Sequence, residues 1–138
     1  MKAARRARAR TAALQSLYEL EARPTGVEDA IVDLTDHFAP PPMDAVYHRQ
    51  LVEGVSARRR ELDDTLRQAS ERWRLERFLV IDHVILRIAV YELMNELAPP
   101  AVIIAEAVKL GAKYGSEESA SFINGVLDTL YAQLREQE

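Results

Sequence analysis

The segment Val84–Met94 constrains the fold of this chain more than any other stretch of its sequence. Drawn as an α-helix, it carries apolar residues on nearly all of its sides. A helix without a polar face has to be enclosed by other elements, so we expect this one at the centre of the domain. Elsewhere apolar residues recur at helical spacing, and the alternation that is typical of strands is absent. The sequence therefore predicts an all-α fold.

Proline, glycine and polar residues divide the rest of the chain into further helices. We expect these over residues Ala4–Ala22, Val27–Phe38, Ala45–Ala69 and Ala101–Tyr114, with a last helix after Ser116. The charged fraction of 29% and the hydrophobic fraction of 48% are typical of a globular chain. The expected architecture is a compact bundle of about six or seven helices, forming one domain over residues 1–138.

Single residues predict details of these helices. Asp44 and Ser116 are the expected N-caps of the helices that follow them. Gly54 and Ser56 are candidate points of division within the long third segment, or positions where a neighbour approaches closely. Glycine inside a helix costs about 1 kcal/mol relative to alanine. Gly125 in the last helix therefore predicts the close approach of a neighbour.

The chain contains no cysteine. This excludes disulfides, thiolate metal sites and cysteine nucleophiles, and it fits a reducing cytoplasm. No apolar stretch is long enough to span a membrane. Gln15, Glu19 and Glu21 interrupt the segment that a secretory signal would need to be apolar. An organellar transit peptide stays open as an alternative, because no acid precedes Glu19.

An arginine-rich block opens a chain whose net charge is −4. The block contains no acid, and its cations are Lys2, Arg5, Arg6, Arg8 and Arg10. On a helical wheel Arg10 falls on the apolar side, while the other arginines point elsewhere. We expect the block to project beyond the core, because cations on all sides cannot be buried. Cations at a helix N-terminus oppose the helix dipole, and a bound polyanion would reverse that effect. Composition alone leaves nucleic-acid binding and a solvated tail as alternatives.

The sequence offers no catalytic constellation, and we expect neither enzymatic activity nor a metal or cofactor. His37, His48 and His83 lie far apart and lack a second ligand at helical spacing. There is no glycine-rich phosphate loop and no nucleophile elbow. Arg87 and Glu92 on the central helix are interpreted as part of a buried pair or network rather than as catalytic groups.

A second candidate binding feature lies around the last helix. Phe122 sits at the edge of the apolar stripe beside Asn124, and Lys113 and Tyr114 lie nearby in the sequence. An aromatic ring beside an amide and a cation is a candidate platform for stacking an RNA base. Simple helix packing is the alternative.

Six motifs, in this order and along nearly the whole chain, resemble the NusB family of bacterial transcription antitermination factors. They are Arg10-x-x-Ala13-x-Gln15-x-Leu17-Tyr18, LVEGV (51–55), IDHVILRIAVYEL (81–93), Pro99-x-x-Val102-x-Ile104-x-Glu106-Ala107-Val108, Lys113-Tyr114-Gly115 and FINGVLD (122–128). Trp73, between the second and the third of these motifs, belongs to the same resemblance. The resemblance implies an all-helical fold in two small helical halves.

The resemblance also implies partners. Proteins of this family bind the single-stranded boxA element of ribosomal RNA leader transcripts together with NusE, a small-subunit ribosomal protein. The complex joins other Nus factors and RNA polymerase, and it supports transcription and maturation of ribosomal RNA. RNA-binding residues would be Lys2, Arg5, Arg6, Arg8, Arg10, Gln15, Lys113, Tyr114, Phe122 and Asn124. The NusE surface would involve Tyr18, Asp82, Arg87 and Glu118.

One departure and two alternatives accompany this resemblance. Ala105 stands where the family usually has asparagine, so an amide that could order the neighbouring loop is missing. The same helical module resembles the N-terminal domain of a ribosomal RNA methyltransferase, but 138 residues do not supply the further cofactor-binding domain. A structural homodimer that uses the arginine-rich helix for self-association is the other alternative.

Overall fold

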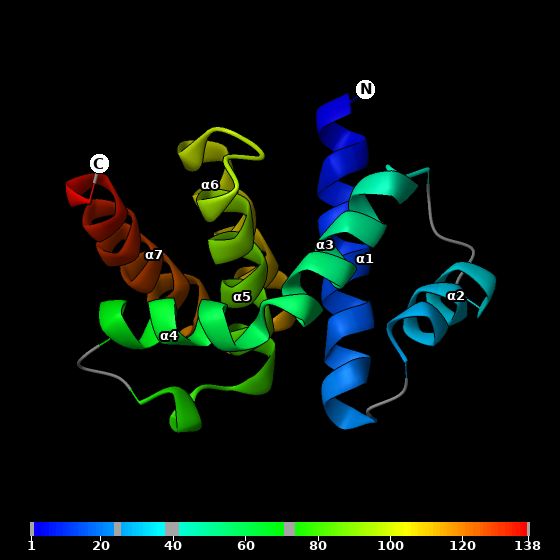
Figure 1. The fold of residues 1–138 in the computed structure, drawn as a ribbon, viewed down its shortest axis with the longest axis horizontal. Helices are drawn as coiled ribbons and strands as arrows, with labels where there is room; N and C mark the ends of the chain where they lie inside the picture. Colours follow the sequence, from blue (N-terminus) through cyan, green and yellow to red (C-terminus); the bar gives the residue numbers. More distant parts are fainter. Residues whose placement is uncertain (1, 24–25, 38–41, 71–73, 138) are drawn as a thin grey trace. The chain divides into compact units, whose positions relative to one another are not determined.

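The computed structural model describes residues 2–23, 26–37, 42–70 and 74–137 (Figure 1). Over these residues it contains seven α-helices and one short 3₁₀ helix, and no strand. The all-α prediction is therefore confirmed. The chain forms two compact helical units, Met1–Ala57 and Arg58–Glu138. No helix in the described part of the chain combines the length and apolar character needed to cross a membrane.

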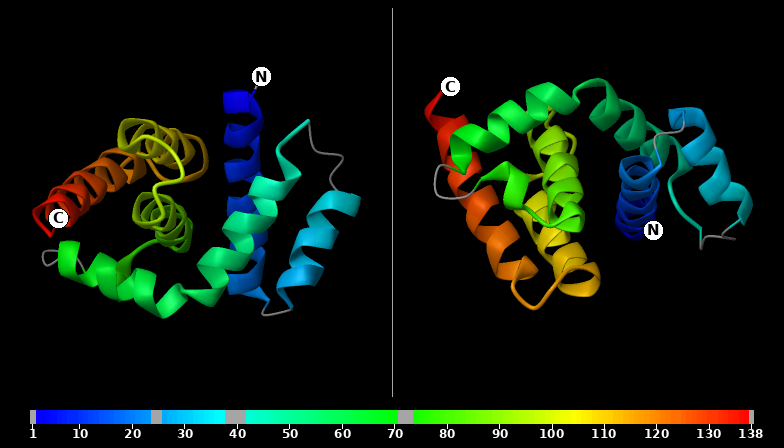
Figure 2. Two further views of the ribbon diagram at one scale, coloured as in Figure 1. Left: turned by 45° about the horizontal axis from the view of Figure 1, so that its top comes forward. Right: turned by 90° about the horizontal axis from the view of Figure 1, so that it is seen from below.

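The first unit consists of three helices that all contact one another (Figure 2). They are α1 (Lys2–Ala22), α2 (Val27–His37) and α3 (Ala45–Ala57). Small side chains at Ala9, Ala12 and Ala13 are buried and let the neighbouring helices approach α1 closely. Asp44 caps α3 as predicted, because its carboxylate accepts a hydrogen bond of 3.0 Å from the backbone N–H of Tyr47. The predicted end of α2 at Phe38 lies outside the described residues.

The second unit is built around α5, which contacts α4, α6 and α7. Its elements are α4 (Arg59–Ala69), η1 (Leu75–Arg77), α5 (Val80–Met94), α6 (Pro100–Tyr114) and α7 (Ser119–Glu136). Every residue from Val84 to Leu93 is buried, which confirms the prediction of a central helix. The long third segment of the prediction is in fact two helices, and the break falls at Arg58 rather than at Gly54 or Ser56.

Helices α6 and α7 approach each other at a glycine that the sequence analysis did not single out. A Cβ on Gly111 would lie 2.6 Å from Cδ1 of Ile123, so a side chain at this position would force Ile123 to move. The expectation for Gly125 was wrong, because a Cβ there would meet no described atom within 4 Å. The packing of the two helices therefore favours glycine at position 111, whereas Gly125 faces open space.

The turn between α6 and α7 also differs from the prediction. Ser116 was expected to cap the last helix, but α7 begins at Ser119 and its N-cap residue is Glu118. The Ser119 hydroxyl instead accepts a hydrogen bond of 2.8 Å from the Ser116 N–H. Gly115 ends α6 with a φ of −93°, so a left-handed conformation is not the reason for glycine there. A Cβ on Gly115 would collide with the Ser119 side chain.

These contacts predict opposite effects for two glycine-to-alanine substitutions. Gly125→Ala should raise the free energy of unfolding by about 0.5–1 kcal/mol, because alanine favours the helix and fits the open space. Gly111→Ala should lower it by about 1–3 kcal/mol, because Ile123 has to move. Urea unfolding of both variants measures the difference. A destabilised Gly125→Ala variant would contradict this assignment of the packing.

Candidate nucleic-acid interface

The arginine-rich block forms the first turns of α1, and its residues differ in exposure. Lys2 and Arg5 are exposed, and Arg6 and Arg8 are half-buried. Arg10 is only 4% exposed and lies on the buried side of the helix, as the helical wheel predicted. The expectation that the whole block projects beyond the core was therefore wrong. Exposure instead decreases along the block, from the open first turn to the buried Arg10.

A single aromatic ring on α3 explains the burial of Arg10. The guanidinium carbons of Arg6 and Arg10 lie 4.3 Å and 5.6 Å from the centre of the Tyr47 ring. The two arginines are four residues apart and therefore share a face of α1. Tyr47 is only 2% exposed, so the contact is shielded from water, where a cation–π contact is strongest. The ring thus orders both arginine side chains.

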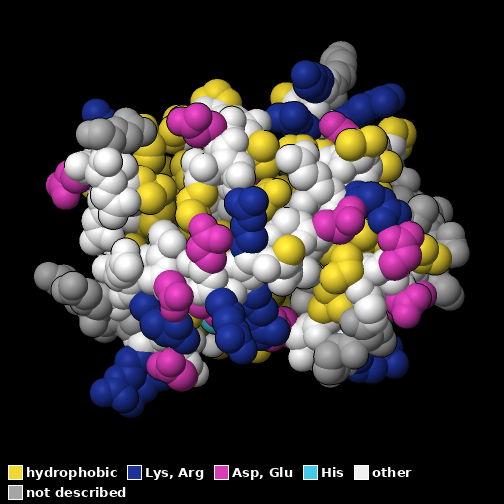
Figure 3. Space-filling view, in the orientation of Figure 1, with side chains coloured by type: hydrophobic (Ala, Val, Ile, Leu, Met, Phe, Trp, Pro, Cys, Tyr) yellow, Lys and Arg dark blue, Asp and Glu magenta, His cyan; other side chains and the backbone are white. Residues whose placement is uncertain are grey.

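Backbone contacts hold the same end of α1 to the segment that precedes α3. The Arg8 Nε donates a hydrogen bond to the Pro42 carbonyl. The Asp44 N–H donates one of 3.2 Å to the Arg5 carbonyl. Lys and Arg side chains gather around the amino-terminal end of α1 in the space-filling view (Figure 3). The block is thus a fixed part of the first unit.

Two further predicted residues lie along α1. Gln15 is exposed two turns after Arg8 and therefore lies on the same face of the helix. Tyr18, predicted as a partner contact, is 46% exposed. It follows Gln15 by three residues, so the two side chains are neighbours on the helix surface. Both are available for contact.

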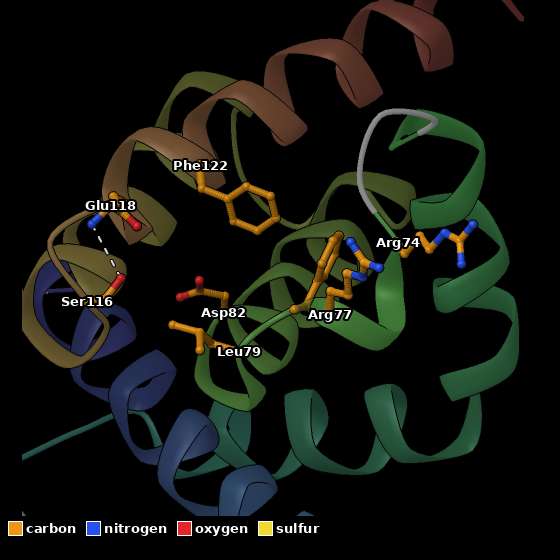
Figure 4. A pocket seen from close by; sticks show the side chains of 8 residues that line it. Arg74, Arg77, Leu79, Asp82, Ser116, Glu118 and Phe122 are labelled. Atoms are coloured by element: carbon orange, nitrogen blue, oxygen red, sulfur yellow. Dashed lines mark hydrogen bonds between the residues drawn. The ribbon is translucent and has the colours of Figure 1, made fainter.

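The second unit contains a pocket of about 410 Å³ (Figure 4). Its lining comes from the segment before α5, the first turn of α5, the turn before α7 and the first turn of α7. The residues are Arg74, Arg77, Phe78, Leu79, Asp82, Ser116, Glu118 and Phe122. Phe122 and Asp82 face each other across this space. The fold thus brings together three predicted site residues, Asp82, Glu118 and Phe122.

Asp82 is a buried acid at the wall of this pocket. The residue is 4% exposed, and no hydrogen-bond partner for its Oδ1 is found among the described residues. Burial raises the pKa of its carboxyl, and an interaction with the Ser119 side chain only partly offsets that rise. The site therefore favours a ligand that can donate a hydrogen bond or a positive charge to Asp82.

Phe122 is half-buried and forms part of the pocket wall. Its ring packs edge-to-face against Phe78, with ring centres 4.9 Å apart and an angle of 83° between the planes. Arg74 and Arg77 are exposed beside these rings. Sequence reasoning missed Arg74, Arg77 and Phe78. The sequence pattern that could have identified them is a pair of arginines three residues apart, followed directly by an aromatic residue.

The other predicted RNA contacts of this unit do not line the pocket. Lys113 and Tyr114 are exposed at the end of α6, where the ammonium lies 5.3 Å from the centre of the Tyr114 ring. Asn124 is exposed on α7 and donates a hydrogen bond of 3.3 Å to Asp128. It follows Phe122 by two residues, so the two side chains do not face the same direction.

Arg87, predicted as a partner contact, is 5% exposed. Its Nε and one terminal nitrogen donate to the two oxygens of Asp63 at 2.9 Å and 3.0 Å. His83 Nε2 lies 2.7 Å from Asp63 Oδ1. Burial opposes ionisation of Asp63, but the bonds from His83 and Arg87 outweigh it and hold the pKa of this carboxyl well below its usual range. The predicted buried network is confirmed for Arg87, and Asp63 is its partner.

The histidines belong to separate structural contacts. His48 is buried and lies 3.0 Å from the Ser16 hydroxyl, and burial followed by the charge of Arg49 lowers its pKa. His83 bonds to Asp63 as described above. The side chain of His37 lies outside the described residues. The described residues contain no cluster of three or more His, Cys, Asp and Glu side chains that could hold a metal ion.

Comparison with known proteins shows the family to which this chain belongs. The NusB family model matches residues 7–132. The transcription antitermination protein NusB of Anaeromyxobacter sp. (strain Fw109-5) is 44% identical over 131 residues, which cover 94% of this chain and 92% of the relative. The protein of the same name from Sorangium cellulosum (strain So ce56) is 39% identical, and 94% of this chain and 93% of the relative are covered.

Solved structures give the same result. The structure of T. maritima NusB superposes with a TM-score of 0.82 at 31% identity, covering 93% of this chain and 91% of that one. A structure described as antitermination factors NusB and NusE in complex with dsRNA gives a TM-score of 0.83 at 25% identity, with coverages of 93% and 96%.

The environment of Asp82 predicts an unusual dependence of stability on pH. Because folding raises the pKa of this carboxyl, the folded state binds a proton more tightly than the unfolded state. Stability should therefore fall as pH rises from the unfolded pKa through the folded pKa. Asp82→Asn should unfold at a higher temperature than the natural protein at neutral pH, and this advantage should vanish in acid below about pH 3.9. Thermal unfolding across a pH series measures it; an equal effect at every pH would contradict the prediction.

Proposed function

Because the chain belongs to the NusB family, we propose that it is a transcription antitermination factor. It binds boxA-type RNA of ribosomal RNA leader transcripts together with the ribosomal protein NusE, and it joins other Nus factors and RNA polymerase in a larger complex. Its role is that of a non-catalytic adaptor. Relatives of 39–44% identity with the same name support this proposal. A similar fold in a structure that holds NusB, NusE and RNA supports it as well.

The observation that carries the proposal is the ordered basic end of α1. Lys2 and Arg5 are exposed, and Arg6 is held against Tyr47. Cations of this kind attract phosphates and release the counterions of the RNA. The N-terminus of α1 adds the positive end of the helix dipole. Because Tyr47 already orders the arginines, less side-chain entropy is lost when RNA binds. Gln15 extends this surface along α1.

The pocket of the second unit supplies the second RNA contact. An unstacked base is placed on the exposed part of the Phe122 ring, and Arg74 and Arg77 beside the ring offer charge to the adjacent phosphates. Lys113, Tyr114 and Asn124 are proposed as outer contacts, because all three are exposed. Stacking tolerates any base, so the base edges must provide the sequence preference.

NusE is proposed to contact Tyr18, Asp82 and Glu118. Tyr18 and Glu118 are exposed, and Asp82 has an oxygen in need of a donor. Arg87 is buried in its ion pair with Asp63, so its contribution is indirect. When RNA and NusE each contact the chain as well as one another, binding of the first raises the effective concentration of the second.

The exposed cations of the block provide a direct test of phosphate binding. The double variant Lys2→Ala with Arg5→Ala should weaken binding of a boxA-type leader RNA. It should also reduce the slope of log affinity against log salt by up to about 1.4, since each phosphate contact to single-stranded RNA contributes about 0.7. Fluorescence anisotropy at several salt concentrations measures both quantities. This pair is preferred to Arg6 and Arg10, whose removal would also disturb packing on Tyr47.

A matched control is Arg58→Ala with Arg60→Ala. It removes the same charge from exposed positions that the proposal does not involve. Its salt slope should stay close to that of the natural protein. Equal effects of the two double variants would show only a general influence of net charge, and the proposed role of the block would be wrong.

The adaptor role predicts cooperation between RNA and protein partner. The affinity for boxA-type RNA should increase at least about tenfold when NusE is present at saturating concentration, because both surfaces then act together. The comparison is a titration with and without NusE, using a scrambled RNA of the same length as control. No preference for boxA-type RNA in either titration would refute the proposed function. Sedimentation in the same samples tests the alternative of a homodimer that conceals the arginines.

A further inference from the structure

Three aromatic rings of the second unit form a continuous series, which we name the ring column: His83, Phe78 and Phe122. The centres of His83 and Phe78 are 5.7 Å apart with an angle of 77° between the planes. Phe78 and Phe122 are 4.9 Å apart at 83°. Both contacts have the edge-to-face geometry that aromatic pairs favour. The column therefore leads from α5 to the pocket wall on α7.

The inner end of the column is fixed by a hydrogen bond to a carboxylate. His83 Nε2 lies 2.7 Å from Asp63 Oδ1. The surrounding hydrogen bonds keep Asp63 ionised, so its oxygens can only accept and His83 must donate through Nε2. Arg87 holds the same carboxylate through two nitrogens. The carboxylate thus sets the rotation of the imidazole ring.

We propose that Asp63 and His83 are positioning residues for the binding of an RNA base at Phe122. They act through Phe78, and neither lines the pocket itself. This inference rests on the proposed function and deepens it. It assigns a role in ligand binding to an imidazole and a carboxylate that would otherwise count only as part of the core.

The physical reason lies in the partial exposure of Phe122. A ring at the surface can adopt other rotamers, and ordering it costs free energy when a ligand binds. An edge-to-face neighbour restricts these rotamers before the ligand arrives. Phe78 provides that neighbour, but it lies in the short segment between η1 and α5. His83, half-buried and held by Asp63, supports Phe78 from the helix.

The test uses two substitutions that separate the ring from its hydrogen bond. His83→Gln keeps a donor for Asp63 but removes the ring. It should weaken binding of a boxA-type leader RNA about three- to tenfold, the range that corresponds to an aromatic pair. His83→Phe restores a ring against Phe78 and should recover part of this loss. The loss should disappear in a Phe122→Leu background, because His83 acts only through Phe122.

His48→Gln is the matched control. His48 is also a buried histidine with a hydrogen bond to a side chain, but it belongs to the first unit, whereas the three rings of the column belong to the second. The effects of His48→Gln and Phe122→Leu on the affinity for RNA should therefore simply add. The proposal is overturned if His83→Gln binds RNA like the natural protein. It is equally overturned if the effects of His83→Gln and Phe122→Leu simply add.

A measurement without RNA separates this proposal from the proposed function. The ring signals of Phe122 in NMR spectra of the free protein should shift in His83→Gln and move back toward their natural positions in His83→Phe. Unchanged Phe122 signals in His83→Gln would refute the ring column even if RNA binds. Shifted signals in a protein that binds no leader RNA would support the column and refute the proposed function instead.

Discussion

The ion pair between Arg87 and Asp63 allows a charged residue to sit in the middle of the central helix α5. Every residue from Val84 to Leu93 is buried, and an unpaired guanidinium in such a place would cost several kcal/mol. Asp63 on α4 satisfies it through two hydrogen bonds. The same carboxylate also fixes His83 and thereby the aromatic wall of the pocket. One buried contact thus links the packing of α4 on α5 to the shape of a surface site.

At the basic end of α1, an aromatic ring rather than a carboxylate accommodates the buried charge. Lone cations on all sides of a helix do not belong in a core, yet Arg10 is buried. The long arginine side chain has an apolar stem and a flat, weakly hydrated head, and both suit a contact with an aromatic ring. Tyr47 offers such a ring to Arg6 and Arg10 together. An acidic protein can therefore display a small and well-ordered basic surface at one helix end.

Much of the fold could be predicted from local patterns. Apolar periodicity and helix-breaking residues predicted most of the helices. The apolar segment Val84–Met94 predicted which helix lies at the centre of its unit. The cap at Asp44 was correct as well. The errors fell where geometry depends on residues distant in the sequence. Gly125 looked like a packing site but faces open space, whereas Gly111 meets Ile123. The sequence shows that a glycine is present but not which atoms surround it.

The candidate site could likewise be predicted only in part from the sequence. Phe122, Asp82 and Glu118 were predicted individually, and the fold places all three around one pocket. Arg74, Arg77 and Phe78 were missed, because a short 3₁₀ turn between two helices has no periodicity to mark its exposed face. Arg87 was predicted to belong to a buried pair or network, but its partner Asp63, 24 positions away in the sequence, was not identified. Such a pairing becomes visible only in three dimensions.

The shared contact of Arg6 and Arg10 with Tyr47 has a thermodynamic consequence for the first unit. Tyr47 belongs to α3, so the arginines keep their arrangement only while α1 and α3 remain packed. A polyanion that prefers the ordered arrangement must then favour the packed state by the same free energy. Occupancy of the basic surface and resistance of α1 and α3 to local unfolding are two measures of one equilibrium.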